Sequence, residues 1–319
     1  MKQFQGKLFL ILGFLFAGTS VVTARILLEK LGSFTIAAAG LGLLLVCLTP
    51  FYWKKLVRAV RALSVADWRM LVLQAVFGIF LFRVFLLFGV QNTSTIEAGI
   101  LTGATPAITA LLAYLFVRER LIKKSLLGIC CTVAGVVLLQ GVNLTEGSFS
   151  IHHFWGNVLV LCAAASEALF QALSRKHQLA QAQKAQIDPM AQTLLVSFVA
   201  FLLCVIPAAL ERPFRPLLVS GPVEWLALAW YGLVVTALSY GLFYAGVRRC
   251  NAYTAAACSG MMPLTSVLLS MLLFGETLGI AQCAGGALIF ISMLLIGEKE
   301  KPPIAREPEN GLAASWEEK

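Results

Sequence analysis

Charged residues are scarce in this sequence. They make up 13% of its 319 residues, whereas soluble globular domains carry about 25%. Histidine occurs three times and never as HExxH, there is no GxxxxGK[ST] loop, and none of the eight cysteines belongs to a CxxC pair. These gaps exclude a water-soluble domain, and they leave no motif for a zinc protease, a P-loop nucleotidase or a disulfide framework. We therefore expect no metal, no cofactor and no enzymatic activity.

Apolar residues dominate instead, at 59%, and the mean hydropathy is +0.84. They gather in runs of about 20 residues, the length that crosses a hydrocarbon core of roughly 30 Å as a helix. The runs lack the alternation that is typical of membrane β-strands. The sequence therefore predicts an all-α integral membrane protein with ten transmembrane helices, near residues 8–28, 34–53, 70–90, 96–117, 125–142, 154–174, 190–210, 225–247, 253–274 and 279–297.

Lysine and arginine are distributed unevenly between the predicted loops. If both termini face the cytoplasm, 20 of them lie on that side and 4 on the other, namely Arg25, Lys30, Arg212 and Arg215, with Arg83 inside a span. Such a bias sets the orientation of a membrane protein. The net charge of +9 then reflects topology, because the basic residues are scattered over short loops without interleaved aromatics. We expect no nucleic-acid partner.

The chain repeats itself with a period of 157 residues. At this offset four punctuating residues superimpose without a gap: Gly103 on Gly260, Pro106 on Pro263, Glu119 on Glu276 and Gly128 on Gly285. A long period with such residues in step indicates duplication. Each half, 1–145 and 146–297, holds five spans, so the second must enter the membrane from the opposite face. We expect two inverted five-helix repeats around a central cavity, and a disordered cytoplasmic tail at 298–319.

This doubled pattern resembles the EamA-type transporters of the drug/metabolite transporter superfamily. In each half, a helix with a central Pro precedes a turn that contains Glu and a helix that bears Gly. The resemblance covers residues 6–297, and it implies two inverted five-helix bundles around a central cavity. It also implies transport of small metabolites, often outward, across the bacterial cytoplasmic (inner) membrane. We expect a monomer or homodimer. Many members carry an arginine in the second helix, and residues 34–48 contain none, so no role tied to that position carries over.

Arg83 and Tyr240 superimpose at the same offset of 157 residues. Arg83 lies about 20 Å from the cytoplasmic edge of the third run at 1.5 Å per residue. A cation at that depth costs about 2.5–3.5 kcal/mol unless it faces protein or water. We expect both residues to line the substrate cavity, where the guanidinium would bind a carboxylate or a phosphate. The alternative is a structural ion pair that does not contact the substrate.

Glu167 is the carboxylate that lies deep in a predicted span. A medium of low dielectric favours the protonated form of such a group, so that it takes up and releases a proton during transport. Gln171 follows four residues later on the same helix face. We expect Glu167 to couple transport to protons and Gln171 to contact the substrate. A permanent pair between Arg83 and Glu167 is the alternative.

Other polar and aromatic residues in the spans, Thr19, Ser239 and Tyr244, are further candidates for substrate binding. Helix packing and interfacial anchoring are the alternatives for them. Pro106 and Pro263 each free a backbone carbonyl in mid-span, so we expect hinges there.

These patterns together favour a secondary transporter of small amino-acid-like or amphipathic metabolites. We expect it to export them by alternating access with coupling to protons, so that its partners are the substrate, the lipid bilayer and protons. An uncoupled facilitator and a drug efflux pump are the alternatives. An intramembrane enzyme or a receptor would not account for the inverted repeat.

The charge bias makes the topology testable. Reporter fusions at residues 60, 122, 180, 250 and 310 should report the cytoplasm, and fusions at residues 31, 93, 148 and 217 should report the opposite side. If fusions at 148 and 180 report the same side, the sixth span does not exist and the inverted repeat fails with it.

Overall fold

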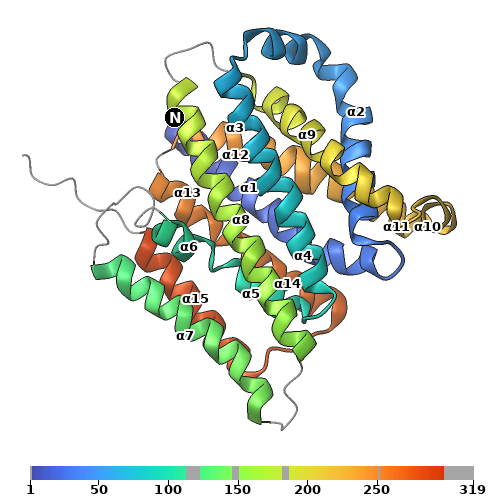
Figure 1. Cartoon of the computed structure of the whole chain (residues 1–319). Coiled ribbons are helices and arrows are strands. Elements are labelled where there is room, and N and C mark those ends of the chain that lie inside the picture. Colours follow the sequence, from blue (N-terminus) through green and yellow to red (C-terminus); the bar gives the residue numbers. More distant parts are fainter. Residues whose placement is uncertain (1, 113–122, 146–150, 182–186, 251, 298–319) are drawn as a thin grey trace, which may run out of the picture.

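The computed structural model describes residues 2–112, 123–145, 151–181, 187–250 and 252–297 (Figure 1). These residues form helices joined by turns, and the described part of the chain contains no strand. In chain order the elements are α1 (Lys2–Leu28), α2 (Ser33–Ala62), α3 (Val65–Ala75), η1 (Val76–Leu81), α4 (Phe82–Val90), α5 (Thr95–Thr102), α6 (Thr105–Leu112), α7 (Lys123–Thr145), α8 (Ile151–Gln181), α9 (Pro189–Leu210), α10 (Phe214–Val219), α11 (Pro222–Ala229), η3 (Trp230–Leu238), α12 (Ser239–Val247), α13 (Ala252–Ser259), α14 (Met261–Phe274) and α15 (Ile280–Gly297). The segments η1 and η3 are π-helical.

Six stretches among the described residues are long and apolar enough to cross a membrane. They are Gln3–Leu28, Ser33–Ala62, Val65–Val90, His152–Gln178, Pro189–Leu210 and Pro222–Val247. Two shorter apolar helices follow at Met261–Phe274 and Ile280–Ile296. The all-α membrane fold is therefore confirmed. The count of ten spans stays a prediction, because the expected fourth span, 96–117, extends beyond the described residues.

The expected fourth and ninth spans are interrupted. Gly103 and Ala104 separate α5 from α6, and Gly260 separates α13 from α14. Pro106 and Pro263 lie in the first turn of the helix that follows each break. Proline has no N–H to donate and its ring clashes with the preceding turn, so a helix starts beside a proline more readily than it continues through one. The structure places a break ahead of each proline, and a hinge there stays a prediction.

Helix starts in the two halves recur at the spacing of the sequence repeat. α3 and α11, α4 and α12, α5 and α13, and α7 and α15 each begin 157 residues apart. In the first pair, α3 and α11, a carboxylate caps the start of each helix. Asp67 accepts a hydrogen bond from the Ser64 N–H (3.0 Å), and Glu224 accepts one from the Gly221 N–H (2.7 Å). These caps satisfy N–H groups that the helix itself leaves without a partner.

Helices of one half pack against helices of the other (Figure 1). α1 of the first half contacts α12 and α14 of the second, while α8 of the second half contacts α4 and α6 of the first. α2 packs along α9, and α7 packs beside α15. Buried apolar residues form one large cluster between α2, α3 and α9 and another between α1, α8 and α12. Side chains from both halves therefore meet in the middle of the bundle.

Glycines permit the closest of these contacts. A Cβ on Gly232 of η3 would collide with the backbone carbonyl of Gly40 in α2. A Cβ on Gly135 of α7 would lie 2.7 Å from the carbonyl oxygen of Gly285 in α15. Both contacts involve backbone, which cannot move aside as a flexible side chain can. The helix pairs α2–η3 and α7–α15 therefore depend on the missing side chains.

The close approach at Gly232 predicts a specific loss of stability. Gly232→Ala should destabilise the protein by about 1–3 kcal/mol, because α2 and η3 must separate to admit the methyl group. Gly42→Ala in α2 is the matched control, since its Cβ would lie 3.5 Å from the Phe201 ring, an ordinary contact. Thermal unfolding of the detergent-solubilised protein compares the two variants. Equal unfolding midpoints would contradict the close approach.

Candidate functional site

A small cavity lies in the middle of the helix bundle. Its volume is about 30 Å³, which is large enough to hold a water molecule. α1, α4, α8, η3, α12 and α14 supply its wall, so both halves contribute. Most of the lining side chains are apolar, and the polar ones are Ser20, Glu167, Ser239 and Tyr240. Apolar walls with a few convergent polar groups are typical of a ligand site.

Glu167 and Ser20 bring hydrogen-bonding capacity to this cavity. Glu167 in α8 is 9% exposed, and its Oε1 accepts a hydrogen bond from Gln171 Nε2 (3.1 Å). Ser20 in α1 is 1% exposed, and its hydroxyl has no hydrogen-bond partner among the described residues. An unsatisfied buried hydroxyl costs about 1–3 kcal/mol. Such a group in a cavity beside a carboxylate points to a ligand that would complete its hydrogen bonds.

Tyr240 and Ser239 tie α12 to the first half at the cavity wall. The Tyr240 hydroxyl donates to the carbonyl oxygen of Gly78 in η1, and the Ser239 hydroxyl donates to the carbonyl oxygen of Gly13 in α1 (2.9 Å). The Tyr240 ring also packs against Phe170 of α8, with 5.1 Å between the ring centroids. π-Helical turns such as η1 occur frequently at functional sites. Both sequence-predicted residues therefore face the cavity while their hydroxyls are engaged in holding its wall.

Arg83 lies behind the cavity wall. It is 4% exposed, Nη1 donates to the carbonyl oxygen of Ala37 (3.3 Å), and Nη2 donates to the Thr236 hydroxyl. Its guanidinium also stacks over the Tyr231 ring, 4.5 Å from the centroid. No carboxylate of the described residues lies within ion-pair distance, so the structure contains no direct pair between Arg83 and Glu167. A carbonyl, a hydroxyl and an aromatic face satisfy this buried cation instead.

The remaining sequence-predicted residues lie at three different places. Gln171 contacts Glu167 without lining the cavity. Thr19 accepts a hydrogen bond from Trp230 Nε1 (2.9 Å) in a separate groove of about 320 Å³ between α1, α11 and α14. Tyr244 is fully buried, and its hydroxyl donates to Gln74 Oε1 (2.8 Å). Of the residues expected to bind the substrate, Ser239 and Tyr240 thus line the central cavity, whereas Gln171, Thr19 and Tyr244 do not.

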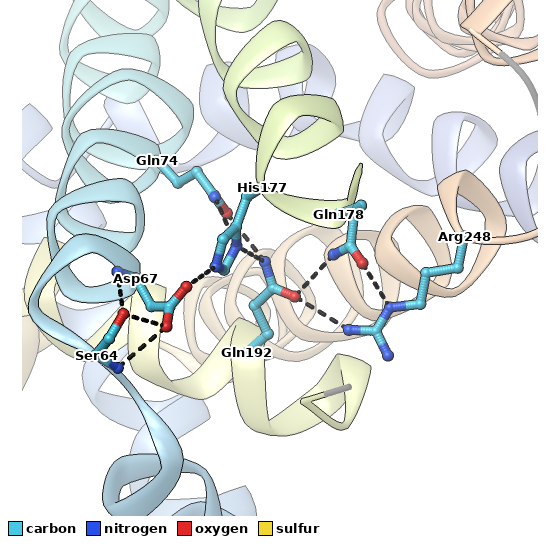
Figure 2. A network of polar contacts seen from close by, with 7 residues as sticks. All are labelled: Ser64, Asp67, Gln74, His177, Gln178, Gln192 and Arg248. Carbon is cyan, nitrogen blue, oxygen red and sulfur yellow. Dashed lines mark hydrogen bonds and ion pairs between the residues drawn. The ribbon is translucent and has the colours of Figure 1, made fainter. Parts of the chain in front are cut away.

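A buried polar network connects α3, α8 and α9 (Figure 2), and Tyr244 of α12 joins it through Gln74. The Nε2 atom of His177 lies 3.5 Å from the Asp67 carboxylate, and its Nδ1 atom lies 3.4 Å from Gln74 Nε2. Gln192 Nε2 donates to Gln74 Oε1 (3.1 Å) and also approaches the His177 Nδ1 atom (3.5 Å). Because amide donors face Nδ1, Nε2 is the nitrogen that donates to Asp67.

The network continues to the end of α12. Arg248 Nε donates to Gln178 Oε1 (2.8 Å), and Arg248 Nη2 donates to Gln192 Oε1 (3.3 Å) (Figure 2). Gln178 in turn donates to Gln192 (3.0 Å). Burial lowers the pKa of Arg248, which stands just after α12. The three side chains close this end of the bundle with polar contacts between helices.

A second polar network lies at the other end of α8. Glu97 of α5 accepts hydrogen bonds from Asn157 (3.0 Å) and from Gln282 (3.2 Å), and its carboxylate lies 3.3 Å from His153 Nε2. His153 and His177 are 24 residues apart, about 36 Å along a helix. α8 therefore carries a histidine–carboxylate contact near each end, in both cases to a carboxylate of the first half.

The histidines and Gln192 have no predicted role in the sequence. The histidines lack the spacing of a metal motif, and Gln192 is a lone amide near the start of an apolar run. The signal that the sequence does offer is the position of these residues near the ends of predicted spans. His177 and Gln192 share an end of the bundle with Asp67, and His153 shares the other end with Glu97. That signal indicates which end of the bundle a residue shares, but not which partner it contacts.

Gln192 and Ser197 allow a matched test of the first network. Gln192→Leu keeps a side chain of similar size but removes the partner of Gln74, Gln178 and Arg248, so it should destabilise the protein by about 1–3 kcal/mol. Ser197→Ala, in the same helix, should not destabilise the protein, because the buried Ser197 hydroxyl has no partner among the described residues. Thermal unfolding in detergent measures both. A Gln192→Leu variant as stable as Ser197→Ala would contradict the network.

Comparison with known proteins agrees with this architecture. The sequence matches the EamA-like transporter family over residues 4–140 and 154–297. The uncharacterized transporter YetK of Bacillus subtilis is 30% identical over 303 residues, which cover 91% of this chain and 87% of YetK. A Salmonella typhimurium protein named "Probable amino-acid metabolite efflux pump" is 27% identical over 187 residues, which cover 58% of this chain and 61% of that protein.

A solved crystal structure shares the fold. It superimposes with a TM-score of 0.57 and 18% sequence identity, over 91% of this chain and 95% of that chain. The family match covers both halves, and the relatives are described as transporters. Together with the apolar helices, these findings indicate a transporter rather than an enzyme. This multi-pass membrane protein belongs to the EamA-like transporter family.

Proposed function

We propose that this transporter exports small metabolites by alternating access through the Glu167 cavity. One observation carries the proposal: a buried carboxylate faces a cavity between the two halves, beside a Ser20 hydroxyl that has no partner among the described residues. The Salmonella relative named as an amino-acid metabolite efflux pump favours amino-acid-like substrates. The ammonium group of such a substrate would form a charge-assisted hydrogen bond with Glu167, and Ser20 would bond a second polar group.

The proposed architecture has ten spans in two inverted halves, residues 1–145 and 146–297, with both termini in the cytoplasm of a bacterial cell. Two observations support it, the helix starts that recur every 157 residues and the uneven distribution of basic residues. Inverted halves can adopt two nearly equivalent arrangements, each open to one side of the membrane. The breaks at Gly103 and Gly260 are the proposed hinges, with Pro106 and Pro263 at the start of the moving helices.

The two polar networks are the proposed gates. The cavity of about 30 Å³ is roughly a tenth of the smallest ligand pockets, about 300 Å³, so a substrate enters only when helices separate. The His177 network joins α3 to helices of the second half, and the Glu97 network joins α5 to α8 and α15. Opening one network while the other stays formed would expose the cavity to one side only.

Competition for Glu167 is the proposed coupling. A carboxylate that holds a proton cannot hold an ammonium group, so substrate and proton would occupy Glu167 alternately and move in opposite directions. Arg83 supports this site from behind, because it holds Thr236 and Tyr231 of η3 while its neighbour Phe82 lines the cavity. An uncoupled facilitator is the second candidate function, and Glu167 distinguishes the two.

Vesicles that carry the purified protein test the coupling. With a proton gradient imposed, the wild type should accumulate a radiolabelled amino acid or analogue, chosen by a tolerance screen of overproducing cells. Glu167→Gln keeps the shape and the contact with Gln171 but cannot titrate, so it should abolish accumulation while exchange down the substrate's own gradient continues. Ser20→Ala should raise the half-saturating substrate concentration by about 2- to 12-fold, the equivalent of one hydrogen bond.

Glu29→Gln is the control for this experiment. Glu29 is an exposed carboxylate just after α1, away from the cavity, and its loss should leave transport unchanged. Accumulation by Glu167→Gln would show that this carboxylate does not couple transport. An unchanged half-saturating concentration in Ser20→Ala would contradict substrate contact at the Ser20 hydroxyl.

A further inference from the structure

The end of α2 has the character of a helix that lies on a membrane surface. α2 bends, and its last part crosses one end of the bundle toward α3 (Figure 1). Pro50 lies inside the helix and explains the bend, because it removes one backbone hydrogen bond. Three aromatic residues follow, of which Phe51 is 85% and Trp53 58% exposed. Four cations come after them: Lys54, Lys55, Arg58 and Arg61. Exposed aromatics beside cations are typical of the interface between lipid and water.

A groove of about 650 Å³ lies beside this segment, between α2, α3 and α9. Its lining is almost entirely apolar, and it is separate from the Glu167 cavity. Arg61 and Trp68 line it near the turn from α2 to α3. Along α9 the lining residues run from Leu194 to Phe201, a length of about 10 Å. The groove is therefore an apolar slot with a cation at one end.

Basic side chains outnumber acidic ones at this end of the groove. Residues 51–69 contain five lysines and arginines and one acid, Asp67, which contacts His177. Lys55 binds Asp188 (2.9 Å). That contact helps to hold the pKa of the Asp188 carboxyl below its usual range, against the opposing effect of burial. No carboxylate of the described residues lies within ion-pair distance of Arg61. The charge at the rim of the groove is thus available to an external anion.

We propose that this groove binds an anionic phospholipid, with an acyl chain along α9 and the phosphate at Arg61. A guanidinium can bind phosphate oxygens in a bidentate manner, and the Trp53 and Trp68 indoles suit the depth of the headgroups. An anionic surface also attracts the other cations of the segment. That the site lies in the cytoplasmic leaflet rests on the topology proposed above.

The bound lipid would pack against helices that carry the His177 network. Trp68 follows Asp67 directly in α3, and Leu194 stands two residues after Gln192 in α9. Occupation of the groove would hold α2, α3 and α9 together at this end and so favour the closed form of that network. The lipid then acts as a stabiliser of one gate.

Native mass spectrometry of the detergent-purified protein tests the site. The protein is equilibrated with phosphatidylglycerol or with phosphatidylcholine of the same acyl chains, and bound lipids are counted. The wild type should bind phosphatidylglycerol at least about fivefold more tightly. Arg61→Gln should remove that preference and leave phosphatidylcholine binding unchanged. Val57→Trp, which narrows the groove, should weaken binding of both lipids.

Arg58→Gln is the matched control. Arg58 lies on the same segment with the same charge but does not line the groove, so its loss should weaken binding of phosphatidylglycerol less than the loss of Arg61 does. Equal affinity of the wild type for both lipids, an equal loss in Arg61→Gln and Arg58→Gln, or full binding by Val57→Trp would each overturn the proposal. The measurement needs neither transport nor sidedness, so its outcome is independent of the proposed function.

Discussion

A polar group in hydrocarbon must find its partner inside the protein, because the lipid offers none. This constraint accounts for the arrangement of the charged and amide side chains. Arg83 is enclosed by a carbonyl, a hydroxyl and an aromatic ring, although no carboxylate of the described residues reaches it. His177 and His153 sit in networks that connect at least three helices each. The hydroxyls of Ser20 and Ser197 both depart from this rule, but of the two only Ser20 lines the central cavity, which is why it indicates a ligand.

The glutamate that recurs in both halves shows how the same constraint shapes a sequence motif. Locally, Glu276 reads as part of a turn. In the structure its carboxylate accepts a hydrogen bond from the N–H of Ile96 (3.0 Å), at the start of α5 and 180 residues away. A helix start carries unsatisfied N–H groups and a partial positive charge, so a carboxylate is favourable there. The residue that marks the repeat thus also joins the two halves. Its counterpart Glu119 lies outside the described residues.

The features that could be predicted from the sequence are those that depend on the residues of a single segment. Hydropathy revealed the helical membrane fold, and a lone carboxylate in an apolar run drew attention to Glu167, which does face the cavity. The rotation of each helix about its axis is not encoded so simply. Estimated depth could not show that Arg83 turns toward Tyr231, or that Tyr244 turns away from the cavity into the His177 network. That network depends on contacts between helices whose partners are 14 to 170 residues apart.

Two closed networks on one helix set an energetic scale for the proposed cycle. A hydrogen bond contributes about 0.5–1.5 kcal/mol net, so releasing the few bonds of one network costs a few kcal/mol. A ligand that binds with millimolar affinity contributes about 4 kcal/mol, and it shifts an equilibrium only by its difference in affinity between the two states. Substrate binding is therefore enough to offset the loss of several bonds of one network and too small to offset the opening of both. α8 carries a contact of each network, at His153 and at His177. Because weak substrate binding cannot release both networks at once, the cavity would open to one side of the membrane at a time.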